Sequence, residues 1–297
     1  MSHLTLFGLL IAALIAACTA YEHLEQSLWT RFNKTDLRLG AGHFAEVRVV
    51  EPLAHLSGQY VAKIYNRLYQ DNKTVLNEIE CHRSVVSSFV PKLYYSFYDP
   101  VADQWALVMD YAGRYSMEKL QVEITKRTFL NRDVSLLTFI IANLLEGLRD
   151  IHRSNVLHRD FMPRNLVVSE SGFIHTVDFS NALIGPAGNM KMDVCKVCRI
   201  AARFMFDEPD RNVLPSVVNI RAHLDRWYFV SERMNNFLVD CIENPYIEHL
   251  QRNPLFDGFD WTGLRQQTMQ SPLIEAVKNA EFTIPDLDAS LRMESYD

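Results

Sequence analysis

Two patterns of apolar residues divide the chain beyond its N-terminal segment. From about Leu37 to Asp110, short runs of β-branched and aromatic residues are bounded by Gly, Pro, Asn or Asp, which is typical of strands. From Tyr111 onward, apolar residues recur every three or four positions, which is typical of buried helices. The sequence therefore predicts an α+β fold, with a smaller β-rich part followed by a larger helical part.

Individual elements follow from these patterns. Four runs are expected to lie in strands: Arg38–Val50, Tyr60–Tyr65, Leu93–Phe97 and Gln104–Asp110. One predicted helix, Lys73–Ser87, interrupts them. A long buried helix is predicted in the second part, where one face carries Leu137, Ile141, Leu144, Leu148 and Ile151.

The N-terminal segment, residues 1–21, has no charged residue, and Leu4 to Cys18 is almost wholly apolar. A run of 15 residues is short for a transmembrane helix, which needs about 20. It fits the apolar region of a secretory signal peptide, and Cys18-Thr19-Ala20 resembles a cleavage site, but no Lys or Arg precedes the run. An anchor, a signal peptide and a buried helix stay open, with residues 4–20 as the candidate membrane attachment.

Positive charges after the apolar run bear on topology. Arg31, Lys34 and Arg38 follow the run, and positive charge tends to stay in the cytoplasm. If the segment is retained as an anchor, we expect a membrane-associated protein whose folded part faces the cytosol. A cytoplasmic protein and a secreted protein are the alternatives.

Composition narrows the possible partners and the possible roles of the cysteines. The 30 basic and 36 acidic residues give a net charge of −6, so the composition does not favour a nucleic-acid partner. Five cysteines, an odd number, do not suggest a disulfide framework. Cys195 and Cys198 are spaced like metal ligands, but no second pair follows them. We expect them to be a packed pair of small apolar residues on a helix rather than a zinc site.

One segment holds residues suited to phosphoryl transfer. His158-Arg159-Asp160 is followed by Asn165, and Asp178-Phe179-Ser180 comes after a predicted hairpin of Leu166–Val168 and residues 173–177. Asn165 and Asp178 offer the oxygen ligands that Mg²⁺ prefers. Asp160 can accept the proton of an attacking hydroxyl.

This arrangement resembles the protein kinase superfamily, in which H-R-D-x4-N precedes D-F-G. The likeness implies a two-lobed protein-kinase-like fold, with a small β-rich N-lobe at residues 22–110 and a larger helical C-lobe at residues 111–297. It also implies an ATP-dependent phosphotransferase that uses Mg²⁺ and moves the γ-phosphoryl group to a hydroxyl. Asp160 would be the catalytic base, and Asn165 and Asp178 the metal ligands.

The likeness extends upstream to residues that would bind ATP. Leu39–Val47 resembles the Gly-rich loop, in which Gly40 and Gly42 let the backbone approach phosphate and Val47 follows. Val61 would lie beside adenine. Lys63, in a run resembling V-A-I-K, would hold the α- and β-phosphates.

Further positions complete the expected nucleotide site. Glu78 is the expected partner of Lys63, because it lies within the apolar stripe of its helix while Glu80 points to the opposite side. Met109 would be the gatekeeper residue, and the backbone of Asp110 and Ala112 would bind adenine.

The chain departs from the family pattern at several positions. Ala45 replaces the third loop glycine, Ser180 replaces the glycine of D-F-G, and no A-P-E follows. Met162 stands where serine/threonine kinases have lysine, and Arg164 could supply the missing catalytic cation. Only fourteen residues separate Asp178 from Asp193, so the segment that usually cradles a peptide is greatly shortened. Ser180 is the only hydroxyl residue from Phe179 to Asp193, so no activation by phosphorylation is expected there.

These departures leave three functions open. The leading one is an active, divergent protein kinase with a protein hydroxyl as its substrate. The second is a small-molecule kinase, similar to aminoglycoside or choline phosphotransferases, which also lack the peptide-binding segment. The third is a pseudokinase that acts as a binding module. The presence of Lys63, Asp160, Asn165 and Asp178 favours an enzyme.

Overall fold

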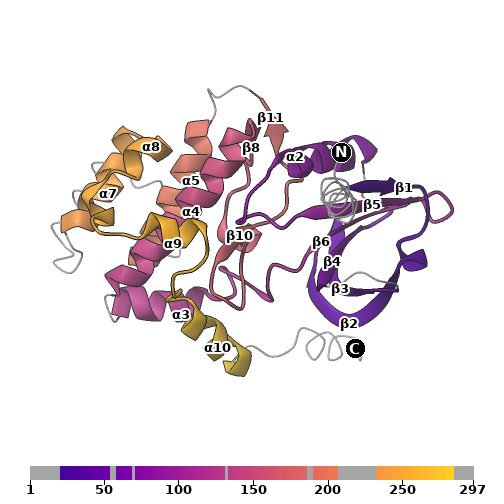
Figure 1. Cartoon of the computed structure of the whole chain (residues 1–297), viewed down its shortest axis with the longest axis horizontal. Helices are drawn as coiled ribbons and strands as arrows, with labels where there is room; N and C mark the ends of the chain where they lie inside the picture. The colour runs from indigo at the N-terminus through magenta and orange to yellow at the C-terminus, as the bar shows by residue number, and fades with distance from the viewer. Residues whose placement is uncertain are drawn as a thin grey trace, which may run out of the picture. The chain divides into compact units, whose positions relative to one another are not determined.

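The computed structural model describes residues 21–53, 58–68, 71–130, 133–185, 190–206 and 232–283. The chain divides into two compact units, one with the residues up to Val75 and Lys92–Tyr111, the other with Leu76–Pro91 and the residues from Ala112 onward. The first unit is built on a sheet and the second mainly on helices (Figure 1). The predicted α+β class is confirmed, whereas the expected lobe boundary after residue 110 stays a prediction.

The candidate membrane attachment at residues 4–20 lies outside the described residues. Within the part of the chain that the structure describes, no helix combines the length and the apolar character needed to cross a membrane.

The sheet of the first unit has six strands in the order β1-β5-β6-β4-β3-β2. Its strands are β1 (Glu22–Leu24), β2 (Phe32–Ala41), β3 (Ala45–Pro52), β4 (Tyr60–Tyr65), β5 (Leu93–Asp99) and β6 (Gln104–Asp110). The predicted run Arg38–Val50 is two antiparallel strands, because the chain turns back where the Gly42 N–H donates to the Ala45 carbonyl at 2.9 Å. The other three predicted runs each form one strand.

Aromatic residues fill the core of the first unit. Phe32 is 1% exposed and meets the rings of Tyr60, Tyr95 and Phe97 edge-on, with centroids 5.9 to 6.1 Å apart. Edge-to-face packing of this kind adds to the gain from burying apolar area. The cluster joins β2 to β4 and β5, so it fixes strands that are distant in sequence.

Strand β1 is an element that the sequence patterns did not predict. It pairs in parallel with β5, with Glu22 opposite Tyr95. The Ser96 hydroxyl lies 2.6 Å from the Tyr21 hydroxyl and 2.7 Å from Nδ1 of His23. Three residues offer few ladder bonds, so side-chain contacts to β5 help to hold this strand in place.

The second unit contains most of the helices. They are α2 (Asn72–Ser84), which belongs to this unit from Leu76 onward, α3 (Gln121–Thr125), α4 (Val134–Arg153), α5 (Met190–Phe206), α7 (Glu232–Glu243), α8 (Ile247–Leu250), α9 (Trp261–Arg265) and α10 (Ile274–Thr283). Helix α4 confirms the predicted long buried helix. It begins after Asp133, whose side chain accepts a hydrogen bond from the Leu136 N–H at 3.0 Å and so caps the helix.

Short strands complete the second unit. They are β7 (Tyr115–Ser116), β8 (Val156–Leu157), β9 (Leu166–Val168), β10 (Ile174–Thr176) and β11 (Leu183–Ile184). The predicted hairpin is confirmed as the antiparallel pair β9 and β10, which β7 extends to a three-strand sheet. Strand β11 pairs with β8 and so brings the chain after Asp178 back beside the start of the loop that carries Asp160.

Glu146 is a fully buried carboxylate at the centre of the helical unit. It accepts hydrogen bonds from Gln251 at 2.9 Å and from two nitrogens of Arg265 at 2.9 and 3.1 Å, and it pairs with Arg149. A buried charge is costly unless several partners satisfy it. These contacts therefore connect α4 to the segment from α8 to α9.

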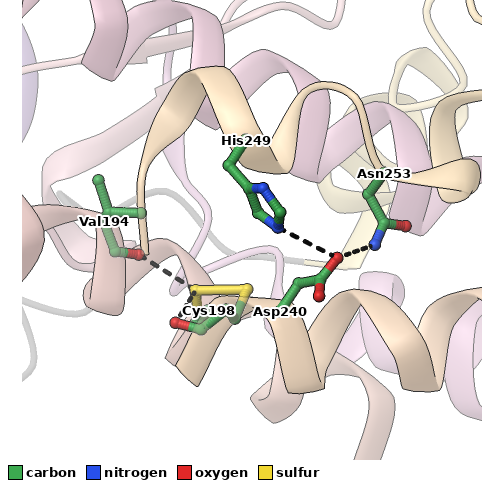
Figure 2. Close-up of a disulfide and its surroundings, with 6 residues drawn as sticks. Val194, Cys198, Asp240, His249 and Asn253 are labelled. Carbon is green, nitrogen blue, oxygen red and sulfur yellow. Dashed lines mark hydrogen bonds and ion pairs between the residues drawn. A yellow bond between two sulfur atoms is a disulfide. The ribbon is translucent and has the colours of Figure 1, made fainter. Parts of the chain in front are cut away.

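A disulfide links Cys198 of α5 to Cys241 of α7, with a Cα–Cα distance of 5.8 Å (Figure 2). The expectation that Cys195 and Cys198 form a packed pair was wrong. Cys195 and Cys198 are three residues apart on α5 and point in somewhat different directions. Helix α7 places Cys241 against the buried side of α5, where it pairs with Cys198. Cys195 is a free thiol, and burial raises its pKa above the ordinary value.

Gly113 is expected to be intolerant of any side chain. Its φ is +142°, and an added Cβ would lie 2.2 Å from the Val168 carbonyl oxygen, where β7 meets β9. We expect Gly113→Ala to lower the free energy of unfolding by about 3 kcal/mol, from strain and steric overlap together. Thermal denaturation of both proteins measures the effect.

Gly185→Ala is the matched control, because the atom nearest to its added Cβ is Cδ2 of Leu183 at an ordinary 3.8 Å. Equal melting temperatures for Gly113→Ala and Gly185→Ala would contradict the steric argument.

Candidate active site

Asp160 lies in the loop between β8 and β9, and its carboxylate has two hydrogen-bond donors. Oδ2 accepts from Nη2 of Arg164 at 3.0 Å and from Nδ2 of Asn165 at 2.9 Å. The Asp160 side chain is 17% exposed, whereas that of Arg164 is 56% exposed. The carboxylate is thus held in place and stays partly exposed.

Asn165 is oriented by the same loop. Its Nδ2 donates both to the Asp160 carbonyl and to the Asp160 carboxylate, each at 2.9 Å, and the residue is 5% exposed. With Nδ2 used in this way, Oδ1 is the atom that can face a cation. The Val177 N–H donates to the Asn165 carbonyl at 2.9 Å, which places the residue before Asp178 against Asn165. An amide oxygen and a carboxylate form a donor set suited to Mg²⁺.

Asp193, near the start of α5, holds the catalytic loop by its backbone. Its two oxygens accept from the N–H of His158 at 2.8 Å and of Arg159 at 2.9 Å, and Nε2 of His152 lies 3.2 Å away. Burial alone would raise the pKa of this carboxyl, but the hydrogen bonds from His152 and the two backbone groups outweigh it and lower the pKa. Asp193 is therefore an ionised carboxylate that orders the loop.

Two residues of the site have left-handed backbone conformations that are uncommon for residues other than glycine. Arg159 has φ = +64° and Asp178 has φ = +65°. Such conformations persist where surrounding contacts determine them. For Arg159 the contact is its N–H bond to Asp193. For Asp178 the Ser180 N–H donates back to its carboxylate at 3.3 Å.

Phe179 lies between two histidine rings in the second unit. The His82 ring on α2 stacks on it with centroids 4.8 Å apart, and the His158 ring meets it at 5.0 Å. Each histidine donates from Nε2 to a carbonyl, His82 to Pro91 at 2.6 Å and His158 to Val177 at 3.1 Å. Burial lowers the pKa of His158, so this ring is neutral near pH 7. The stack ties Asp178 and the catalytic loop to α2.

The residues expected to bind the nucleotide phosphates lie in the first unit. Gly40 pairs with Val47 across the β2–β3 hairpin, and Val47 pairs in turn with Lys63 on β4. Among the described residues, an added Cβ on Gly40 would meet no atom within 4 Å, and one on Gly42 would meet only the Ala45 carbonyl oxygen, at 3.9 Å. The hairpin tip therefore leaves its backbone open to a ligand.

The residues expected beside adenine also lie on neighbouring strands. Val61 on β4 pairs with Met109 on β6, and the two side chains are 6% and 7% exposed. The Asp110 N–H donates to the Lys92 carbonyl at 3.1 Å, which fixes the end of β6. The roles of these residues toward a nucleotide stay predictions.

Glu78 is 1% exposed, whereas Glu80 on the same helix is exposed. This matches the choice of Glu78 as the inward-facing carboxylate. Lys63 belongs to the first unit, and Glu78 and Ala112 belong to the second. The expected pairing of Lys63 with Glu78, and the expected use of Ala112 with Asp110, therefore stay predictions.

The structure adds residues to the site that sequence reasoning had treated as ordinary or had overlooked. His152 is buried near the end of α4 and contacts Asp193. His82 lies four residues after Glu78 and so shares its helix face. That spacing was the available signal for His82.

The fold and these contacts are those expected of a protein kinase domain. A family model described as "Protein kinase domain" matches residues 34–202. The chain therefore belongs to the protein kinase family.

Curated relatives agree with this assignment. The chain is 28% identical over 148 residues to Citron rho-interacting kinase of Rattus norvegicus. That alignment covers 48% of this chain and 7% of the kinase. It is 22% identical over 297 residues to cGMP-dependent protein kinase egl-4 of Caenorhabditis briggsae, and the alignment covers 81% of this chain and 37% of that kinase. It is 27% identical over 166 residues to MAP kinase kinase MKK1/SSP32 of Saccharomyces cerevisiae, and the alignment covers 53% of this chain and 32% of that kinase. The chain thus spans well under half the length of each of these relatives.

Proposed function

We propose that this protein transfers the γ-phosphoryl group of ATP to a hydroxyl group of a protein substrate. The observation that carries the proposal is the ordered catalytic loop, in which Asp160 is oriented by Arg164 and Asn165 and the backbone is anchored by Asp193. The same loop without an accessible carboxylate could not accept a proton from a hydroxyl.

The residues take roles that their environments support. Asp160 orients the attacking hydroxyl and accepts its proton, and Lys63 holds the α- and β-phosphates. Gly40 and Gly42 let the backbone of the hairpin approach the phosphates. Asn165 and Asp178 would hold Mg²⁺, which neutralises phosphate charge when bound.

Arg164 supplies the positive charge that serine/threonine kinases have from a lysine at the position of Met162. Its guanidinium contacts the Asp160 carboxylate at 3.0 Å, and its side chain is more than half exposed. A cation in this position can pair with the negative charge of the transferred phosphoryl group.

The first test is transfer itself. Purified full-length protein with γ-labelled ATP and Mg²⁺ should label hydroxyl residues in a panel of protein substrates. A parallel panel of small hydroxyl compounds separates a protein kinase from a small-molecule kinase. Label in small compounds alone would refute the protein substrate, and no label in either panel would refute the transferase.

Asp178→Ala should remove the Mg²⁺-dependent part of ATP affinity, because it deletes one of the two expected metal ligands. We expect the dissociation constant for ATP with Mg²⁺ to rise about tenfold, toward the value measured in excess chelator, since a lost charge-assisted contact is worth about 1.5 kcal/mol or more. Isothermal titration of both proteins, with and without Mg²⁺, measures the effect.

Asp257→Asn is the control for this titration, because that carboxylate is 63% exposed and lies outside the site. If neither Mg²⁺ nor the Asp178→Ala change alters ATP affinity, the protein is a pseudokinase rather than an enzyme.

A further inference from the structure

Two buried cysteines provide an observation that the proposed activity does not use. Cys198 and Cys241 are 7% and 1% exposed, and their disulfide connects α5 to α7. Their Cα–Cα distance of 5.8 Å is common for disulfides. The link closes a stretch of chain with a sequence separation of 43 residues.

The disulfide lies in a well-packed part of the helical unit. Asp240, next to Cys241, accepts from Nδ2 of Asn253 at 2.6 Å and lies 3.6 Å from Nε2 of His249 (Figure 2). On α5, Asp193 precedes Cys198 by five residues and holds the catalytic loop. The cross-link therefore fixes the helix from which the catalytic loop is held.

Disulfides of this kind bear on the compartment in which a protein folds. Stable disulfides form in secreted proteins and in the lumen of the secretory pathway, whereas the cytosol keeps thiols reduced. A disulfide between buried residues of two helices thus favours an oxidising compartment over the cytosol.

Two sequences for N-glycosylation lie on the surface of the first unit. They are Asn33-Lys34-Thr35 on β2 and Asn72-Lys73-Thr74 at the start of α2, and both asparagines are exposed. Oδ1 of Asn72 accepts from Nε1 of Trp105 at 2.9 Å, so Nδ2, the atom that carries an N-glycan, is not used in that bond. Such a tripeptide is common by chance, but a glycan can be added only in the lumen.

The N-terminal segment is compatible with the same compartment. Cleavage after Ala20 would keep all of β1 and the Tyr21 hydroxyl that contacts Ser96. The apolar run and its cleavage-like end were open to a signal-peptide interpretation. The disulfide and the glycosylation sequences favour that alternative over the cytosolic topology expected from the charges.

We propose that this kinase domain folds in the lumen of the secretory pathway, with Cys198 and Cys241 oxidised and with Asn33 and Asn72 as N-glycan acceptors. The two thiols give up two protons and two electrons to a disulfide-carrying oxidoreductase, which is reduced to its dithiol. Each Asn Nδ2 displaces a lipid diphosphate from an oligosaccharide donor and loses a proton. The substrate class that follows, hydroxyls of proteins in that compartment, rests on the proposed function.

Peptide mapping of the full-length chain from a eukaryotic cell line tests the cross-link. Free thiols are blocked with N-ethylmaleimide at lysis, and the protein is digested with trypsin without reduction. Trypsin separates Val197–Arg199 from the peptide of Cys195, Met192–Lys196, and releases Cys241 in Met234–Arg252. We expect a linked pair of Val197–Arg199 and Met234–Arg252, while Cys195 carries the blocking group.

The same sample tests the glycans. Peptide N-glycosidase should increase the electrophoretic mobility of the protein and convert Asn33 and Asn72 to aspartate, and Asn33→Gln and Asn72→Gln should each remove one glycan. Cys198→Ser should lower the melting temperature by about 10 °C, and the matched Cys195→Ser should leave it unchanged.

Blocked thiols at both Cys198 and Cys241 would overturn the cross-link, and a chain without glycans would overturn the acceptor sites and the lumenal placement. Both readouts are chemical and do not depend on phosphotransfer. A cross-linked, glycosylated protein that transfers no phosphate would therefore refute the proposed function and leave this inference standing.

Discussion

Replacing Asp160 with asparagine is expected to lower the turnover number at least about 100-fold while ATP still binds. The amide keeps the size of the side chain and can still contact Arg164 or Asn165, but it cannot accept a proton from the substrate hydroxyl. Steady-state kinetics with γ-labelled ATP measure the turnover, and titration measures the ATP affinity.

Asp257→Asn makes the same chemical change on an exposed carboxylate and should keep full activity. If Asp160→Asn and Asp257→Asn have equal rates, the assignment of Asp160 as the catalytic base is wrong.

The second large effect is expected at Asp193, which we place as a positioning residue. Asp193→Asn puts an NH₂ group against the N–H donors of His158 and Arg159, or leaves one of them without an acceptor. A buried donor without a partner costs about 1–3 kcal/mol, and the left-handed conformation of Arg159 loses the contact that holds it. We expect the turnover number to fall at least about 100-fold.

The readout must separate this role from general destabilisation. The melting temperature should fall, but at a temperature where circular dichroism shows the variant folded, the KM for ATP should change little while the turnover number is low. Disrupted folding alone would instead lower the active fraction and leave the turnover per folded molecule unchanged, and that result would contradict the positioning role.

Local patterns in the sequence predicted much of the fold. Helix α4 has a strong three-and-four periodicity, and β9 and β10 flank Ser171-Gly172, so each could be found from neighbouring residues. The Asp160 and Asn165 contacts could also be expected, because only four residues of one loop separate them.

Features that depend on distant partners could not be predicted. The disulfide requires α7 to meet α5, and nothing near Cys198 in the sequence indicates Cys241 as its partner. The role of Gly113 depends on the Val168 carbonyl, and nothing near Gly113 in the chain indicates that contact. Strand β1 has only three residues, too few for a pattern to show.

The position of β1 has a consequence for the order in which the sheet assembles during translation. This strand is synthesised before every other strand of the sheet, yet the Ser96 hydroxyl that contacts His23 comes 73 residues later. Contacts between distant residues form slowly, because a long loop must close first. Strand β1 therefore leaves the ribosome before the other strands of this sheet. It stays unpaired until β5 has emerged, so it pairs only after β2, β3 and β4 have been synthesised.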